Sequence, residues 1–210
     1  MGCGRLKTTA SRKEFPTRAL GGNDGMTHRT DDELMVDQIA GDENALRVLV
    51  ERWERPVFAF LVRMLGSPEE AEDLCQDTFI SMIKASGRYR PDGKFQSWLF
   101  RIAGNLARSR LRRRKILRWL PLTAEQAETP AGDPDALARL TGREERHLVQ
   151  GAVARLPDRQ RQALVLKQYQ DLSYQEIADA MGTSVSSVQM LLHRAMTTLR
   201  RDPVFRRDET

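Results

Sequence analysis

The sequence predicts an all-α fold of two small helical domains joined by a flexible linker. Apolar residues recur every three or four positions over most of residues 30–200, and no segment carries a convincing strand pattern. Serine and glutamate stand three residues apart at two expected helix starts, and glycine or proline stands where helices end. Residues 121–132 are rich in Pro, Thr, Ala, Glu and Gly without periodicity, which indicates the linker.

These patterns divide the chain into four segments. Residues 1–26 are rich in Gly, Thr, Arg and Lys with little apolar periodicity, so we expect a disordered tail. Met26, like Met1, is a candidate start of translation. The other segments are a first helical domain, the linker and a second helical domain, which we place at residues 27–116, 117–137 and 138–205.

Three helices are expected at the start of the first domain. Two of them are separated at Gly41, and Pro56 falls inside the second. The third begins after Ser67, whose hydroxyl can cap the helix while Glu70 reaches back. Its apolar side consists of Ala71, Leu74, Cys75, Thr78, Phe79, Met82 and Ile83. Its exposed residues near the beginning are Glu72, Asp73, Gln76 and Asp77.

A basic block ends the first domain. Residues 86–94, SGRYRPDGK, are turn formers and predict a loop in which Tyr89 is exposed among basic residues. The helix that follows from Phe95 is apolar at its front and basic at its back. Between Arg88 and Arg118 eleven basic residues stand against one acid, whereas the whole chain has a net charge of +5. Such a cluster is typical of nucleic-acid binding, although basic runs also form solvated faces or localisation signals.

Two closely spaced helix starts characterise the second domain. Ser173 and Glu176 match a capping box, and Gly182 suits the end of that helix. Thr183 or Ser184 then caps another helix, whose apolar stripe is Val185, Val188, Leu192, Ala195, Met196 and Leu199. Its opposite face carries Ser186, Ser187, Gln189, Met190, His193, Arg194 and Thr197. The spacing fits a DNA-binding helix-turn-helix and an ordinary helical hairpin about equally.

Composition argues against several classes of protein. Cys3, Cys75 and three histidines form no disulfide framework and no metal-binding spacing, and a reducing, intracellular setting is expected. No apolar run approaches the ~20 residues that span a bilayer, and the N-terminus lacks the pattern of a signal peptide. No nucleophile, base and orienting group stand out. We therefore expect neither an enzyme, nor a cofactor, nor a small-molecule substrate.

The order of four sequence blocks indicates a family: AEDLCQDTFISMIKAS, FQSWLFRIAGNLARSRLRRRK, LPDRQRQALVLKQYQDLSYQEIADAMG and HRAMTTLR. In this order they resemble bacterial sigma factors of the extracytoplasmic-function (ECF) type, over residues 30–115 and 140–201. The resemblance favours the helix-turn-helix over the hairpin. It implies a cytoplasmic protein that binds promoter DNA and the beta-prime and beta subunits of core RNA polymerase.

The first two blocks resemble sigma region 2, in which an acidic helix docks on a coiled coil of the beta-prime subunit. Carried over, this role falls on Glu72, Asp73, Gln76 and Asp77, whereas Leu74 and Phe79 are expected in the core. The resemblance also implies that one set of residues contacts the minus-ten promoter element: Arg88, Tyr89, Arg90, Lys94, Arg101, Asn105, Arg108, Arg112 and Arg113. Tyr89 suits stacking on an unstacked base, worth ~1–3 kcal/mol, while Phe95 and Trp98 are expected to pack beneath it.

The last two blocks resemble sigma region 4, which reads the minus-thirty-five element. The implied DNA-contacting residues are Arg161, Ser184, Ser186, Ser187, Gln189, Met190, His193 and Arg194. Arg161 matches a basic residue that the family places near the DNA backbone. Gln189, Met190 and Leu191 replace the usual Lys, Ser and Arg on the recognition face, which leaves the promoter preference open.

Two other interpretations stay open. A stand-alone helix-turn-helix regulator that binds DNA as a dimer would carry the same second domain, but it would not explain the acidic helix or the basic block. A sigma-like protein that binds polymerase without reading promoters would fit Gln189, Met190 and Leu191. The resemblance also implies an anti-sigma partner. The sequence gives neither its identity, nor the promoter sequence, nor the activating signal.

Overall fold

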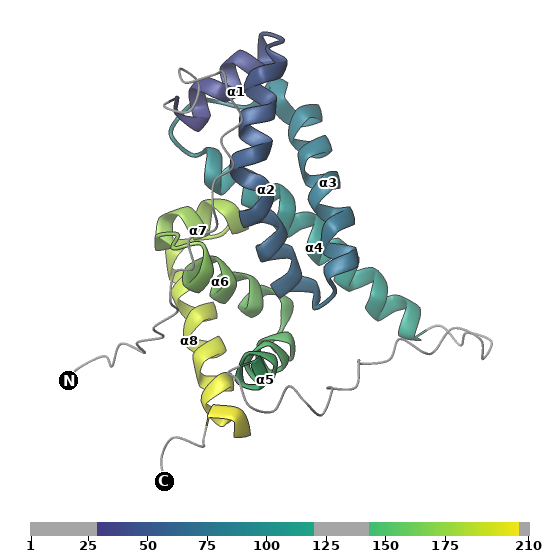
Figure 1. Ribbon diagram of the computed structural model, residues 1–210. Coiled ribbons are helices and arrows are strands. Elements are labelled where there is room, and N and C mark those ends of the chain that lie inside the picture. Colours follow the sequence, from purple (N-terminus) through teal and green to yellow (C-terminus); the bar gives the residue numbers. More distant parts are fainter. Residues whose placement is uncertain (1–28, 120–142, 206–210) are drawn as a thin grey trace.

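The computed structural model describes residues 29–119 and 143–205, and all regular elements in these ranges are helices (Figure 1). The first range holds α1 Asp31–Ile39, α2 Glu43–Leu65, α3 Pro68–Ala85, the 3-10 turn η1 Ser86–Arg88 and α4 Phe95–Trp119. The second holds α5 Arg143–Ala154, α6 Asp158–Tyr169, α7 Tyr174–Met181, α8 Val185–Arg201 and the 3-10 turn η2 Pro203–Phe205. The predicted tail at residues 1–26 lies outside the described residues, as does most of the predicted linker. Helix α4 runs three residues past the predicted domain boundary at residue 116.

The helix starts follow the capping residues. Ser173 and Glu176 form the complete capping box of α7, and Ser184, rather than Thr183, caps α8. Ser67 accepts the backbone N–H of Glu70 at the start of α3. The carboxylate of Glu70 does not reach back, because it pairs with two arginines of α4 instead. Half of the capping box predicted for α3 is therefore replaced by a tertiary contact.

Helices α2, α3 and α4 enclose the core of the first half. Phe60 of α2 and Phe100 of α4 are fully buried and meet edge to face, with ring centroids 5.3 Å apart. Leu74 and Phe79 of α3 are buried, as predicted from the spacing. Ile83 was expected on the same side but is 39% exposed, because the chain near the end of α3 turns away from this core into η1.

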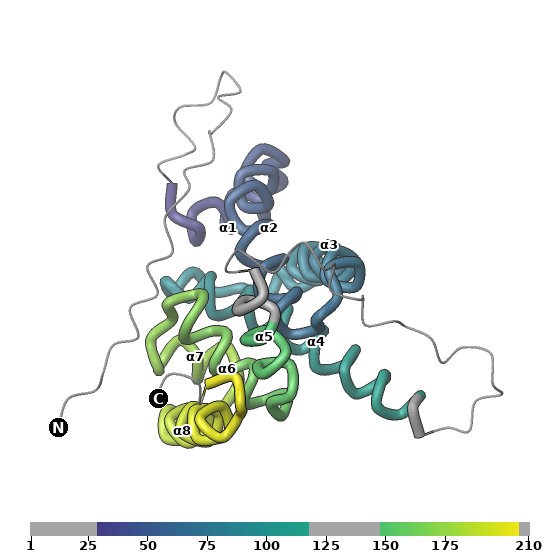
Figure 2. Tube along the Cα trace, turned by 60° about the horizontal axis from the view of Figure 1, so that its bottom comes forward, coloured from purple at the N-terminus to yellow at the C-terminus, as the bar shows by residue number. Residues whose placement is uncertain are grey.

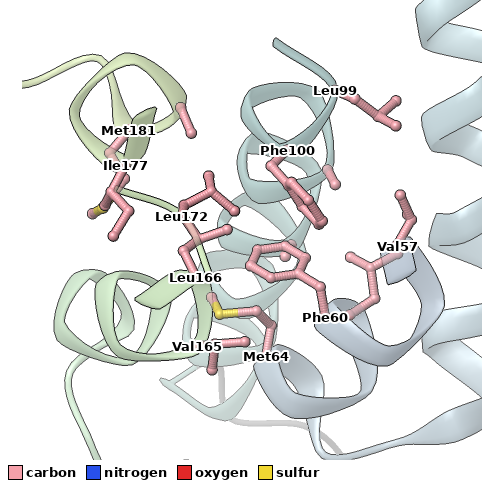
Figure 3. Close-up of a cluster of buried hydrophobic side chains, with 14 of the residues drawn as sticks. Val57, Phe60, Met64, Leu99, Phe100, Val165, Leu166, Leu172, Ile177 and Met181 are labelled. Atoms are coloured by element: carbon pink, nitrogen blue, oxygen red, sulfur yellow. The ribbon is translucent and has the colours of Figure 1, made fainter. Parts of the chain in front are cut away.

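The two halves also pack against each other, which the sequence did not indicate. Figure 3 shows Phe60 and Met64 of α2 and Phe100 of α4 facing Leu166 of α6 and Leu172 of the α6–α7 turn. All five side chains are buried. In Figures 1 and 2, α6 and α7 lie alongside α2 and the first half of α4, whereas the end of α4 projects away from the body. The described residues thus form one body with a continuous apolar core.

Candidate DNA-binding and protein-binding surfaces

The outer face of α3 presents the acidic and amide residues that the sequence singles out. Glu72, Asp73, Gln76 and Asp77 are all exposed, and Ile80 beside them is 48% exposed. Next to this face an open groove of about 560 Å³ runs between α2 and α3, lined by Val50, Glu54, Arg55, Phe58, Glu72, Cys75, Gln76 and Phe79. Acidic side chains around an apolar groove form a surface suited to a protein partner with basic and apolar side chains.

Tyr89 is not the free aromatic side chain that its loop predicts. It is half-buried, its ring lies 4.8 Å from that of Trp98 between centroids, and its hydroxyl donates a hydrogen bond to the carboxylate of Asp32. Burial, together with this bond to Asp32, raises the pKa of Tyr89. The second carboxylate oxygen of Asp32 accepts the backbone N–H of Gly93 at 2.5 Å. Tyr89 therefore anchors the 86–94 loop to α1, which corrects the prediction that it is exposed.

Asp32 is a residue that the sequence analysis missed. It stands in the acidic run Asp31, Asp32 and Glu33, which by its sequence fits the first turn of a helix. The run does serve that purpose, since Thr30 and Glu33 form a complete capping box. No local pattern indicates that the middle acid also holds a loop some sixty positions away.

The basic residues of α4 fall into two groups. Arg110 and Arg114 both contact Glu70 of α3, and Arg114 also donates to the carbonyl of Leu65 at 3.0 Å. Arg108 is half-buried and donates to the amide oxygen of Asn105; burial, then Arg159 and Arg112 nearby, lower its pKa. Seven of the residues predicted to contact the minus-ten element are exposed: Arg88, Arg90, Lys94, Arg101, Asn105, Arg112 and Arg113.

Helix α8 exposes a mainly polar face. Ser184, Ser186, Gln189, Met190, His193 and Arg194 are exposed, and Ser187 is half-buried. The hydroxyl of Ser184 caps the helix, since it accepts a hydrogen bond from the backbone N–H of Ser187 at 3.2 Å. Leu191 does not belong to this face: it is half-buried and packs against the core. Of the three residues that differ from the family's usual recognition face, only Gln189 and Met190 are therefore exposed on α8.

Arg161 is not on any outer surface. It is 6% exposed, and its guanidinium donates to the carbonyls of Met64, Ala154 and Leu156. Burial is the main cause that lowers its pKa. Met64 belongs to α2, so Arg161 links the two halves. In this conformation it cannot reach DNA, contrary to the role carried over from the resemblance.

Among the described residues no group of His, Cys, Asp and Glu could hold a metal ion. In the same residues no helix has the length and apolar character needed to cross a membrane. The surfaces that stand out are thus the acidic face of α3, the basic loop and helix α4, and the outer face of α8.

Comparisons with known proteins show the family of the chain. Two family models match the chain, sigma-70 region 2 over residues 49–116 and sigma-70 region 4 over residues 146–199. The RNA polymerase sigma-H factor of Pseudomonas aeruginosa is 33% identical over 180 residues, which are 81% of this chain and 92% of the relative. The ECF RNA polymerase sigma factor SigW of Bacillus subtilis is 32% identical over 173 residues, or 77% and 90% of the two chains.

Among solved structures, CnrH in complex with the cytosolic domain of CnrY superposes with a TM-score of 0.60 at 26% identity. The match covers 86% of this chain and 99% of CnrH. The chain therefore belongs to the ECF group of the sigma-70 family of RNA polymerase sigma factors. It is an alternative sigma factor, a protein that directs transcription initiation.

Proposed function

We propose that the chain binds core RNA polymerase through the outer face of α3 and directs it to promoters through α4 and α8. The observation that carries this proposal is the separation of opposite charges onto different elements. The acids Glu72, Asp73 and Asp77 are exposed together on α3. The 86–94 loop and α4 carry a separate set of exposed arginines, Arg88, Arg90, Arg101, Arg112 and Arg113. One surface suits a basic partner, and the other suits the phosphates of DNA.

Each DNA-facing surface has a distinct task in this proposal. Arg112 and Arg113 are exposed on the second half of α4 and neutralise phosphates, which positions the DNA without reading its sequence. The 86–94 loop, held by Asp32, contacts the strand that is opened at the minus-ten element. Gln189 and Met190 on α8 face the minus-thirty-five element, where glutamine can pair with adenine and methionine can contact a thymine methyl.

The protein has no catalytic role of its own in this proposal, and it acts in the cytoplasm, where core polymerase is found. An anti-sigma partner is expected as well. The resemblance supports it, and the sigma factor RpoE of Bartonella quintana has been solved with the anti-sigma factor NepR. No described surface of this chain identifies that partner.

Binding to purified bacterial core polymerase tests the docking surface. We expect Asp77→Lys to weaken this binding at least tenfold, because it reverses a charge on the acidic face. Glu43→Lys, which reverses an exposed charge at the start of α2, is the matched control and should bind like the wild type. Equal binding by both variants would remove α3 as the docking surface. Tight DNA binding by a dimer of the chain without polymerase would favour the stand-alone regulator.

A further inference from the structure

Met190 is the most exposed methionine of the described residues. It is 54% exposed on the outer face of α8. The other described methionines are buried or half-buried: Met35, Met64, Met82, Met181 and Met196. Figure 3 shows two of them, Met64 and Met181, within the apolar core. A water-soluble oxidant therefore reaches the sulfur of Met190 more readily than the sulfur of any other described methionine.

The face on which Met190 lies gives this exposure its meaning. Of the large apolar side chains of α8, a helix described along its whole length, Met190 alone is exposed. Ser186 and Arg194, one turn before and one turn after it on the same face, are polar and exposed. In a major groove, the apolar group that a base edge offers is the methyl group of thymine. An isolated apolar side chain on a polar, DNA-facing helix is suited to contact that methyl group.

Oxidation by a hydroperoxide turns this apolar side chain into a polar one. With hydrogen peroxide, the lone pair of the sulfur attacks one oxygen, the O–O bond breaks and an S–O bond forms. The displaced hydroxide takes the proton of the attacked oxygen and leaves as water. The thioether is thereby oxidised by two electrons to a sulfoxide, and the peroxide is reduced. The sulfoxide oxygen needs a hydrogen-bond donor, which a thymine methyl group cannot supply.

The buried thiol of Cys75 does not compete for the oxidant. The residue is 5% exposed, and burial, then Glu54 and Glu72, raises its pKa to about 11. The thiolate, which is the form of cysteine that peroxide attacks, is therefore scarce at neutral pH. Among the described sulfur atoms, that of Met190 is then the one most open to oxidation.

We propose that Met190 is an oxidation site, at which a hydroperoxide weakens binding to minus-thirty-five elements that contain thymine. The sulfoxide removes the apolar contact and sets a polar oxygen against the methyl group. Methionine sulfoxide reductases reverse this modification, so the loss of binding is reversible. This inference rests on the proposed function, which places α8 on the minus-thirty-five element.

Peptide mass spectrometry tests the site itself. The full chain carries Cys3→Ser, which removes the cysteine outside the described residues, and is treated with increasing amounts of hydrogen peroxide. Catalase then removes the excess, and circular dichroism melts check that the treated chain is folded. Met190 should gain one oxygen atom before any other described methionine does. Earlier oxidation of Met196 or of a buried methionine would overturn the proposal.

Promoter binding by the reconstituted holoenzyme tests the effect. Untreated core polymerase is added to the treated or untreated chain, and the DNA is a promoter selected from a library with the untreated chain. Each thymine of its minus-thirty-five element is replaced in turn by deoxyuridine, which lacks only the methyl group. At one position this change should weaken binding of the untreated holoenzyme roughly fourfold, the factor that burial of one methyl group contributes. After oxidation, affinity for the thymine promoter should fall at least as far, and thymine and deoxyuridine should bind alike there.

Two variants separate Met190 from oxidation elsewhere in the chain. Met190→Leu has no sulfur at this position, so peroxide should leave its promoter affinity at its own untreated value. Met196→Leu, the matched control on the same helix, should keep the wild-type response to peroxide. Equal responses of the two variants would overturn the proposal, as would unchanged promoter affinity of a chain whose Met190 is fully oxidised. Failure of the proposed function would appear before any oxidation, as an untreated chain that does not bind core polymerase.

Discussion

At the residue scale, Tyr89 shows how a side chain expected in solvent became part of the scaffold. Its ring packs on Trp98 and Phe95, and its hydroxyl bonds Asp32 of α1. The same carboxylate holds Gly93, so a single acid fixes both ends of the turn that precedes α4. The exposed arginines Arg88 and Arg90, rather than Tyr89, are then the side chains of this loop that are free to meet DNA.

We expect Tyr89→Phe to lower the free energy of unfolding by about 1–2 kcal/mol, because a hydrogen bond to a charged group is lost while the ring packing remains. Urea unfolding at neutral pH measures this. Trp98→Phe, which keeps an aromatic ring at its position, serves as a control for packing alone. No change in stability for Tyr89→Phe would mean that the bond to Asp32 does not hold the loop.

Two raised pKa values predict a loss of stability at alkaline pH. Burial, then Glu54 and Glu72, raises the pKa of Cys75 from 9.0 to about 11. A pKa higher in the folded than in the unfolded state gives stability that is full below pH 9 and is lost as the pH rises toward 11. Tyr89, whose pKa is also raised, adds to the loss above pH 10.

Urea midpoints measured from pH 8 to pH 11 check this sign. The wild type should weaken over this range, and Cys75→Ala should weaken less between pH 9 and pH 11. A Cys75→Ala curve parallel to that of the wild type would show that the thiol is not the titrating group.

At the element scale, the helix-turn-helix depends on one backbone conformation. Gly182 ends α7 with a φ of +59°, in the left-handed region, and open space or ordinary contacts surround the place of its missing Cβ. We expect Gly182→Ala to cost about 1–2 kcal/mol of stability through backbone strain alone. The matched control is Gly151→Ala inside α5, which should gain about 0.5–1 kcal/mol from helix propensity. Urea unfolding of both variants measures the difference, and similar values would contradict the account.

The basic residues of α4 differ in whether they are available to contact DNA. Arg112 is exposed, whereas Arg110 is paired with Glu70. In a promoter complex with polymerase, Arg112→Ala should lower affinity and reduce the salt slope by about 1. Arg110→Ala should leave the slope unchanged. Equal slope changes for the two variants would show that the pairing with Glu70 does not persist on DNA.

Local signals explain why so many elements could be predicted from the sequence. Capping residues and apolar periodicity placed the starts of α3, α7 and α8 because both act within one or two helical turns. The same signals separated the exposed acids of α3 from its buried side. They do not predict the bond of Asp32 to Gly93 or the pairing of Glu70 with Arg114, because these contacts join residues far apart in the chain.

At the scale of the whole molecule, Arg161 is the residue whose role the sequence could not predict. Arg161 stands near the start of a polar helix, so the sequence alone suggests that it contacts a phosphate. It is buried because α6 packs on α2, where it donates to the carbonyl of Met64. From the sequence, the apolar residues of the interface could equally belong to the cores of two separate domains. Periodicity shows that a helix face is buried, but it does not show which surface covers it.

We expect Arg161→Ala to lower the free energy of unfolding by about 3 kcal/mol, because three carbonyls lose a charged donor inside the protein. The exposed Arg159 provides the control, since Arg159→Ala should change stability by less than about 0.5 kcal/mol. Urea unfolding again measures both. A small effect of Arg161→Ala would mean that the halves are already apart in solution.

The most direct test of the central claim is run-off transcription with purified core polymerase over a library of promoters, with and without this protein. As an alternative sigma factor it should produce transcripts with defined start sites that appear only when the protein is added, and that disappear with Asp77→Lys. The absence of protein-dependent start sites on every template, with core polymerase shown to be active, would contradict the account.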